Sequence, residues 1–544
     1  MSILSTLLFY FNRNGSAWKN GVFPSPWDGD RESIFGYVRK HSRNGEQPLG
    51  EAGATLPDDG LFYSGKKLRW GAGALDGAFG HHVGKGEQDN RAGAIHRCLG
   101  RVLGKPSKRN VTELYEELLA ADDPNVADEL LDAVSRDEGV DFKRLVIFFH
   151  WLVTNSPDRC PVKIGIALLG MFQGNALSEL FLTFGCHEEF TLYAVVALRN
   201  SLGNAERELW ELARKVDGWG RIQIVERLAG TRDEEIRGWM LREGYRNSIM
   251  YEYLAHACAT TGDLAKALDA PDPDEPLLDG AGELLEALII GGPAQDMRDY
   301  DDGGRATLKY ITHLRGRDLT LAQFSPIDAI HRFISDQRDW SELEGKGWSK
   351  AARAAIAEGI DEILARTDWQ ARAVAEMEKT LTEDSPAFSI AVQVAKAVGV
   401  DVWEYYYSRQ AAGIGSQWYQ LMRTEDAGRI DKVVSLAERL IPLEEVATGP
   451  ACELGLGPEF EHHSAVDFIV QDLGKFPGKG WPLIKAALKS PVVRNRNMSI
   501  RALERWGREQ WPEGAVSEIE RALAIEPEEK VKARLRALLL LESV

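Results

Sequence analysis

The sequence has little cysteine, and the few cysteines are spread along the whole chain. Its 544 residues include five of them, with no pair at the CxxC spacing of redox or zinc motifs. An odd number without regular spacing disfavours a disulfide framework and fits a reducing compartment. We therefore expect a cytoplasmic protein. The cysteines are Cys98, Cys160, Cys186, Cys258 and Cys452.

Long hydrophobic runs are missing as well. A helix that crosses a membrane needs about 18 or more consecutive apolar residues, and the sequence contains no such run. The apolar segment in residues 1–15 has no basic region and no small-residue cleavage site, so it does not fit a secretory signal. We expect this segment to pack inward, and we expect no association with a membrane.

Basic residues are fewer than acidic ones. The chain has 65 Lys and Arg against 83 Asp and Glu, which gives a net charge of −18 at pH 7. This excess of negative charge opposes broad binding to nucleic acid or to an anionic membrane. It favours a basic partner, for example a basic toxin that the protein would neutralise.

Cofactor motifs are also missing. A phosphate-binding P-loop needs G-x-x-x-x-G-K-[ST], whereas residues 80–86, GHHVGKG, are one residue short and end in glycine where the hydroxyl is required. No GxGxxG follows a convincing strand, and no cysteine lies in a haem-ligand pattern. We therefore expect no cofactor, and no haem, flavin or stoichiometric iron in the purified protein.

Glycine and proline, in contrast, gather in the first 105 or so residues. One or the other occurs every few positions there, and this spacing prevents long helices. From about residue 110 the apolar residues follow a 3.6-residue period, and no persuasive strand appears. Two acidic segments rich in Pro and Gly, residues 269–282 and 291–304, interrupt this pattern. We interpret them as exposed loops or as a boundary between helical halves.

Two successive units near the C-terminus share one pattern. Residues 480–507 and 510–543 each read Trp-Pro, an amphipathic helix, a proline near the turn, and a helix rich in Arg, Ala and Leu. Pro491 and Pro527 lie 36 residues apart, within the range of two-helix repeats. The pattern resembles HEAT-type α-solenoids, most clearly over 380–544. The resemblance implies stacked helix pairs with a long concave binding surface, and it brings no catalytic residue with it.

The predicted fold is therefore mostly all-α. It is a HEAT-like α-solenoid of stacked helix pairs with an irregular, Gly- and Pro-rich cap domain at 1–108. A first helical array is expected at 109–300, and a second array, with the HEAT-like repeats, at 301–544.

A segment in the middle carries a second resemblance. Residues 244–268, followed by 280–302, are similar to bacterial helical proteins labelled limonene hydroxylase. A hydroxylase has to activate oxygen, which requires haem, flavin or non-haem iron. Because the sequence has no motif that would hold any of them, the activity in that label does not follow from these residues.

The stretch LRWGAGALDGAFGHHVGKG, residues 68–86, is the best-motivated candidate site. A carboxylate and an imidazole within hydrogen-bond reach can form an acid–base pair without a cofactor, and glycines let the backbone approach a ligand closely. The candidate catalytic residues are Asp76, His81, His82 and Glu87. Two alternatives stay open. The histidines could bind a metal with His96 and Cys98, or the stretch could be a structural loop with His81 or His82 turned inward.

Three further clusters can be interpreted either as sites or as structure. Cys186–Phe190, CHEEF, fits the polar first turn of a buried helix better than a ligand cluster. Dense aromatics over 403–419 are typical of core packing and also of interface anchors. Arginines over 494–508 could form a binding face or pair with nearby acids. The candidate binding residues are Trp403, Tyr406, Trp418, Arg494, Arg501, Arg505 and Arg508.

The sequence thus favours an α-solenoid that binds a protein partner as a scaffold, since an extended helical array readily supplies a binding surface. One alternative is a cofactor-independent enzyme that uses the loop at 68–89. The other is nucleic-acid binding through the C-terminal arginine face, which the net charge disfavours.

Overall fold

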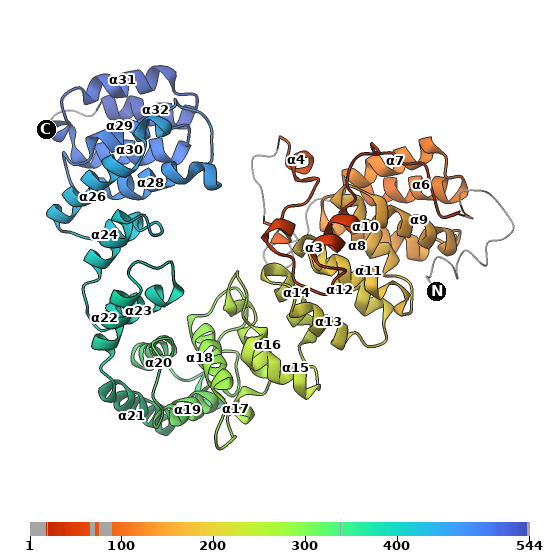
Figure 1. Ribbon diagram of the computed structural model, residues 1–544, viewed down its shortest axis with the longest axis horizontal. Coiled ribbons are helices and arrows are strands. Elements are labelled where there is room, and N and C mark those ends of the chain that lie inside the picture. Colours follow the sequence, from red (N-terminus) through yellow and green to blue (C-terminus); the bar gives the residue numbers. More distant parts are fainter. Residues whose placement is uncertain (1–17, 19, 66–70, 75–89, 338, 541–544) are drawn as a thin grey trace. The chain divides into compact units, whose positions relative to one another are not determined.

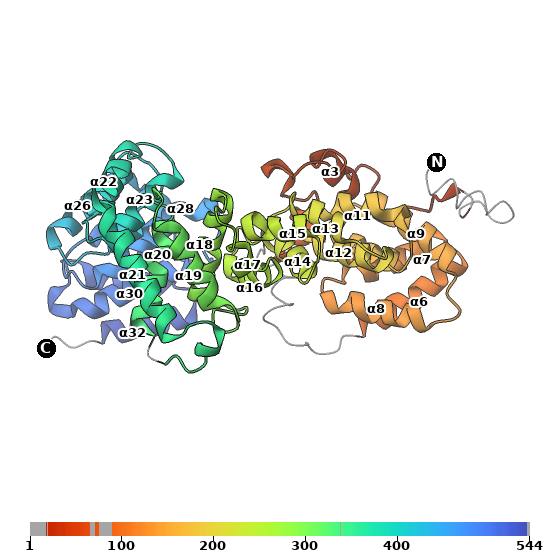
Figure 2. The same cartoon turned by 90° about the horizontal axis from the view of Figure 1, so that it is seen from below.

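The computed structural model describes Trp18 and residues 20–65, 71–74, 90–337 and 339–540. Helices dominate these residues, and they contain no strand, only one isolated bridge between Glu453 and Val492. The predicted all-α fold is confirmed, and Figures 1 and 2 show the helices packed against one another in succession. None of the helices within the described residues is long and apolar enough to cross a bilayer.

The chain divides into two compact units. Unit 1 comprises residues 1–318 and 326–363, and unit 2 comprises residues 319–325 and 364–544. The irregular segment at residues 20–65 belongs to unit 1, together with the helices that follow it. The domain boundaries expected after residues 108 and 300 stay predictions.

Unit 1 begins with short helices and continues with longer ones. Its core is formed by α9 and α10, which are buried almost all round, and α10 packs between α9 and α12. Gly165 lets α9 and α10 approach closely, because a Cβ there would lie 2.4 Å from Cγ1 of Val153. The helices are α3 (Ile34–His41), α4 (Asp59–Phe62), α6 (Arg91–Gly104), α7 (Lys108–Leu119), α8 (Pro124–Arg136), α9 (Phe142–Asn155), α10 (Arg159–Leu169), α11 (Ser178–Gly185), α12 (Glu188–Ser201), α13 (Glu206–Ala213) and α14 (Gly218–Leu228).

The second half of unit 1 begins with α15 (Glu234–Trp239), which continues into a π-helical turn at Met240–Gly244. The interpretation of residues 269–282 as an exposed loop is wrong for residues 275–282, which form the start of a helix; the alternative, a boundary between helical halves, stays a prediction. Asp274 caps that helix and Pro276 fits its first turn, so the same residue types begin a buried helix. The helices are α16 (Ala255–Thr261), α17 (Leu264–Ala267), α18 (Glu275–Ile290), α19 (Gly303–Leu314), α20 (Phe324–Asp336) and α21 (Lys350–Arg366), the last two extending into unit 2 at one end.

Unit 2 contains the two related C-terminal units as helix pairs. In each pair the turn proline, Pro491 or Pro527, lies between the two helices, as the sequence pattern predicts. The indole N–H of Trp506, at the end of α30 (Val493–Trp506), donates to the carbonyl of Leu473, at the end of α28 (Glu461–Leu473). The helices are α22 (Trp369–Lys379), α23 (Pro386–Ala397), α24 (Trp403–Ala411), α25 (Trp418–Leu421), α26 (Ala427–Leu440), α27 (Leu443–Val446), α28 (Glu461–Leu473), α29 (Trp481–Leu488), α30 (Val493–Trp506), α31 (Ala515–Ile525) and α32 (Glu529–Leu539).

Candidate functional site

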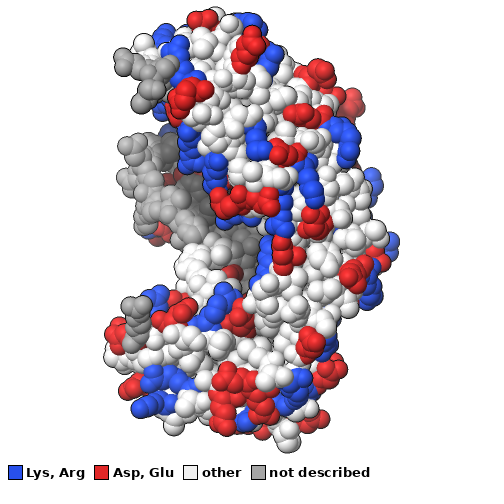
Figure 3. Space-filling model, turned by 90° about the vertical axis from the view of Figure 1, so that its left-hand side faces the viewer, with Lys and Arg blue, Asp and Glu red and all other residues white. Residues whose placement is uncertain are grey.

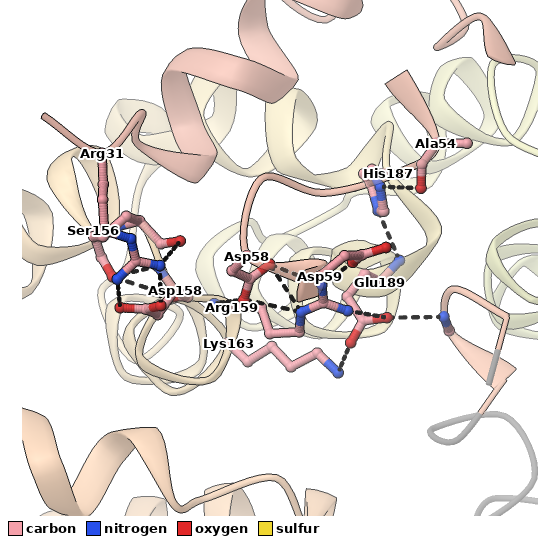
Figure 4. A network of polar contacts seen from close by, with 12 residues as sticks. Arg31, Ala54, Asp58, Asp59, Ser156, Asp158, Arg159, Lys163, His187 and Glu189 are labelled. Atoms are coloured by element: carbon pink, nitrogen blue, oxygen red, sulfur yellow. Dashed lines mark hydrogen bonds and ion pairs between the residues drawn. The ribbon is translucent and has the colours of Figure 1, made fainter. Parts of the chain in front are cut away.

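A buried network of charged side chains attaches the irregular N-terminal segment of unit 1 to its helical core (Figure 4). Arg159, the first residue of α10, is almost fully buried and pairs with two acids from the start of α4. Its Nη2 lies 2.8 Å from Oδ1 of Asp58, and it also pairs with Asp59. The ring of Phe62 lies 4.3 Å from the guanidinium carbon. Such a charge is stable in the interior only because it is fully paired.

Glu189 extends this network from the first turn of α12. Nζ of Lys163 lies 2.7 Å from Oε1 of Glu189, and the backbone N–H of Gly73 donates to Oε2 over 3.4 Å. Burial raises the pKa of Glu189, but Lys163 and Arg159 outweigh burial and hold this pKa below its ordinary value. Gly73 has no room for a side chain, since a Cβ would lie 2.7 Å from the carbonyl oxygen of Glu188. Residues 71–74 are thus fixed against the start of α12.

His187 closes the network on the other side. Its Nε2–H donates to the carbonyl of Ala54 at 3.2 Å, and its Nδ1 accepts the backbone N–H of Glu189 at 3.2 Å. Burial lowers the pKa of this imidazole to about 4. His187 is therefore neutral at pH 7 with both ring nitrogens engaged, so it holds the segment at Ala54 in place and is not available as a general base.

Beside this network lies an open cavity of about 820 Å³. Its lining residues come from within the segments 48–54, 72, 186–188, 214–221 and 246–251, all in unit 1. The charge network fixes two of these walls, since it holds Ala54 and the stretch at 71–74 in place. The volume falls in the range of typical ligand sites.

Glu188 lines this cavity and has a raised pKa. Its Oε2 accepts the backbone N–H of Trp219 at 3.2 Å, so it caps α14 from a neighbouring helix. Partial burial and the nearby carboxylate of Asp217 raise its pKa to about 7, against the opposing effect of the N–H groups of Trp219 and Gly220. Gly218, with φ at +53°, is required here because a Cβ would lie 2.5 Å from Oε2 of Glu188.

The basic residues of the cavity wall are engaged with other parts of the protein. The guanidinium of Arg221 donates to the carbonyls of Ala213, Val216 and Arg246. Arg246 pairs with Glu283, and Nζ of Lys215 donates to the carbonyl of Gly45. Arg214 stacks over the ring of Trp210 at 5.0 Å. Among the described residues of unit 1, none of these basic side chains forms an ion pair with Glu188.

A short apolar loop borders the cavity. Ile249, Met250 and Tyr251 are 40%, 37% and 36% exposed, which is high for three consecutive large apolar side chains. Asn247 fixes them, because its Oδ1 accepts the N–H groups of Ile249 and Met250 and its Nδ2 donates to the carbonyls of Tyr245 and Met250. An exposed apolar group on a rigid loop is a feature of interaction surfaces.

The sequence-predicted catalytic residues all fall in one part of the loop at 68–89, outside the residues that the structure describes. They are Asp76, His81, His82 and Glu87. Of the alternative metal set, His96 pairs with Asp137 at 3.0 Å and Cys98 is buried. Within the described part of the chain, no group of three or more His, Cys, Asp and Glu side chains is arranged to hold a metal ion. The described part of the glycine-rich stretch, residues 71–74, does reach the candidate site, since Ala72 lines the cavity.

The predicted aromatic anchors are core residues. Trp403, Tyr406 and Trp418 are 4%, 9% and 4% exposed, and the indole of Trp403 donates to the carbonyl of Leu421. Side chains buried to this extent leave no surface for a partner, so the core-packing interpretation of this cluster fits the structure.

The predicted arginine face is divided among different surroundings. Arg494 pairs with Asp467 on α28, and Arg508 is half-buried and donates to the carbonyl of Leu539. Arg501 and Arg505 are exposed on α30. On the face shown in Figure 3, Lys and Arg side chains are interspersed with Asp and Glu side chains.

The raised pKa of Glu188 predicts how this residue affects the stability of the protein at different pH values. Because its folded-state pKa is about 7 against an ordinary 4.5, the folded protein retains a proton between these pH values that the unfolded chain releases. The contribution of Glu188 to stability is therefore fully present below pH 4.5 and is lost as the pH rises to 7. We expect Glu188→Gln to equal the wild type at pH 4.5 and to exceed it at pH 8 by on the order of 1–3 kcal/mol.

Urea denaturation at both pH values measures this difference. Glu211→Gln, which changes an exposed acid on α13, is the control. A Glu188→Gln variant that is less stable than the wild type at pH 8 would contradict the burial of this carboxyl.

No family model and no curated protein matches the chain. Among solved structures, it is similar to the crystal structure of an engineered protein from the Northeast Structural Genomics Consortium. That likeness covers 82% of this chain and 98% of the other, with 14% sequence identity and a TM-score of 0.21. At this TM-score it carries no argument about fold or function.

Proposed function

We propose that this protein is a helical-array scaffold that binds a protein partner at the cavity of unit 1 and at the apolar loop Ile249–Tyr251. The array would be built from HEAT-type helix pairs in its C-terminal part and would act in the cytoplasm. Its net charge of −18 favours a basic partner.

The observation that carries this proposal is the loop itself. Three large apolar side chains are exposed together beside an open cavity, and the four hydrogen bonds of Asn247 hold their backbone in place. Exposing apolar groups to water is unfavourable, and a rigid loop loses little entropy when a partner covers it. The geometry therefore suits binding more directly than it suits catalysis, for which His187 is already engaged.

The test compares partner capture by three forms of the full-length protein. We expect the Ile249→Asp/Met250→Asp variant to retain at least about tenfold less of the partner than the wild type does, because charged side chains replace the apolar ones that the partner would bury. Ile525→Asp is the matched control, since Ile525 is also an exposed apolar residue, at 61%, but lies on α31 in unit 2. Equal capture by the loop variant and the control would contradict the proposal, provided that both melt within about 2 °C of the wild type.

A further inference from the structure

In the cavity beside the apolar loop, two neighbouring carboxyl groups form no ion pair among the described residues. Glu188 and Asp217 both line it, and Asp217 is close enough to raise the pKa of Glu188. One oxygen of each is bound by a backbone N–H, Glu188 Oε2 by Trp219 and Asp217 Oδ1 by Ser248. The backbone N–H of Gly220 also acts on the carboxyl of Glu188. A carboxylate has about four acceptor sites, so each group retains acceptor capacity.

Among the described residues, no basic side chain of the same cavity forms an ion pair with Glu188, and the positive charge of Arg221 acts on Asp217 only from a distance. Burial and the charge of Asp217 raise the pKa of Glu188, and two backbone N–H groups lower it. No described basic side chain contributes to this pKa. Arg221 donates hydrogen bonds to backbone carbonyls, and Arg246 forms an ion pair with Glu283. A ligand cation would therefore supply the charge that this part of the cavity lacks.

The surroundings also suit a long side chain that bears its charge at the end. Lysine and arginine have aliphatic stems that pack along apolar surface while the charged group meets a polar site. Here Tyr251 both lines the cavity and belongs to the exposed apolar loop, so an apolar rim adjoins the carboxyl groups. The volume of about 820 Å³ accommodates such a side chain together with neighbouring atoms of its chain.

We propose that Glu188 and Asp217 bind a lysine or arginine side chain of the partner inside this cavity. This assignment rests on the proposed binding function and specifies which chemical group enters the site. Glu188 accepts hydrogen bonds from the cation through the oxygen that Trp219 does not use, and Asp217 adds a second negative charge. The aliphatic stem lies against the rim at Tyr251.

The experiment uses small probes on the full-length protein at pH 8. The probes are Nα-acetyl-arginine amide, Nα-acetyl-lysine amide, the neutral isostere Nα-acetyl-citrulline amide and the anionic Nα-acetyl-glutamate amide, with binding followed by NMR or calorimetry. We expect both cations to bind, and the citrulline probe to bind at least about tenfold more weakly than arginine. Glu188→Gln should weaken the cations by a similar factor, while Glu211→Gln should not.

The pH dependence gives a second readout. With the pKa of Glu188 at about 7, raising the pH from 6 to 8 ionises this carboxyl and should strengthen cation binding by roughly tenfold. The probes keep their charge over this range. The other charged or titratable groups that line the cavity are Glu51, Cys186, His187, Arg214, Lys215, Asp217, Arg221, Arg246 and Tyr251.

The outcomes separate this inference from the proposed function. Equal binding of the citrulline and arginine probes, or tighter binding of the glutamate probe, would overturn the inference, the latter because Arg214 and Lys215 would then dominate the site. Cation binding that the Glu188→Gln variant abolishes supports the inference even if the Ile249→Asp/Met250→Asp variant still captures a partner. In the reverse case, partner capture depends on the apolar loop but not on Glu188. This result would leave the proposed function intact and would overturn the inference that the cavity binds a lysine or arginine side chain.

Discussion

Replacing Arg159 by methionine is expected to destabilise unit 1 by about 3–5 kcal/mol, because removal of one member of a buried ion pair leaves the others as uncompensated charges. The guanidinium is 3% exposed and pairs with Asp58 and Asp59, which are themselves mostly buried. Without it, these carboxylates lose their shared guanidinium, and among the described residues Lys163 remains as the cation paired with Glu189. Urea denaturation followed by circular dichroism measures the loss.

Hydrogen exchange would localise the same change. Because Arg159 attaches the irregular segment to α10, protection should fall first in residues 51–63 and 71–74, which contact the network. Arg109→Met is the control, since Arg109 forms an ion pair with Glu113 but is 85% exposed, and it should cause no measurable change. Adding Asp58→Asn to Arg159→Met should recover part of the lost stability, and failure to do so would argue against buried charge as the cause.

Replacing Arg496 by methionine is expected to cost unit 2 a similar amount, about 3–5 kcal/mol. Arg496 and Glu526 form an ion pair that is 1% and 0% exposed. The guanidinium also donates to the carbonyls of Ser490 and Ala451 at 2.7 and 2.8 Å, so it joins the turn before α30 and the loop at Ala451 to the end of α31. The substitution would leave these carbonyls without the guanidinium donor and the fully buried carboxylate of Glu526 without its cation, while the backbone N–H of Glu528 still donates to that carboxylate.

The double variant Arg496→Met/Glu526→Met tests the explanation. Replacing both members of a buried pair by apolar residues is often close to neutral, so most of the stability should return. Arg534→Met, which removes a half-exposed pair with Glu504, should cost less than about 1 kcal/mol. Since Arg496 lies in unit 2, hydrogen exchange of α9 and α10 in unit 1 should not change in any of these variants. Loss of protection there would contradict the division into two units.

The helical fold could be predicted because its signals are local. The 3.6-residue period, the capping residues and the turn prolines each act within a few positions, and Pro491 and Pro527 lie in turns between helices as expected. The wrong interpretation of residues 275–282 as a loop also arises because these signals are local. Acidic and proline residues occur both in loops and in the first turn of helices, and only the packing of the apolar residues that follow decides between them.

The candidate site could not be predicted because its residues are far apart in the sequence. Asp58 and Arg159 are 101 positions apart, and Glu188 meets Trp219 across 31 positions. The pair Glu188–Glu189 was visible as the polar first turn of a helix, and α12 does begin at Glu188. Nothing local indicates that one of these carboxyls is buried against Arg159 and Lys163 while its neighbour faces a cavity.

The adjacent residues His187 and Glu188 have a joint consequence for how the protein responds to acid. In the folded chain, the imidazole has a pKa of about 4 and the carboxyl has a pKa of about 7, whereas the ordinary values are 6.5 and 4.5. Between pH 4.5 and 6.5, folding thus moves one proton from a histidine to the next residue, a glutamate. The folded and unfolded chains then hold the same number of protons at this pair, and two opposite pH dependences cancel. In mildly acidic solution, both side chains are therefore neutral in the folded protein. The pair nevertheless does not make the free energy of folding depend on pH.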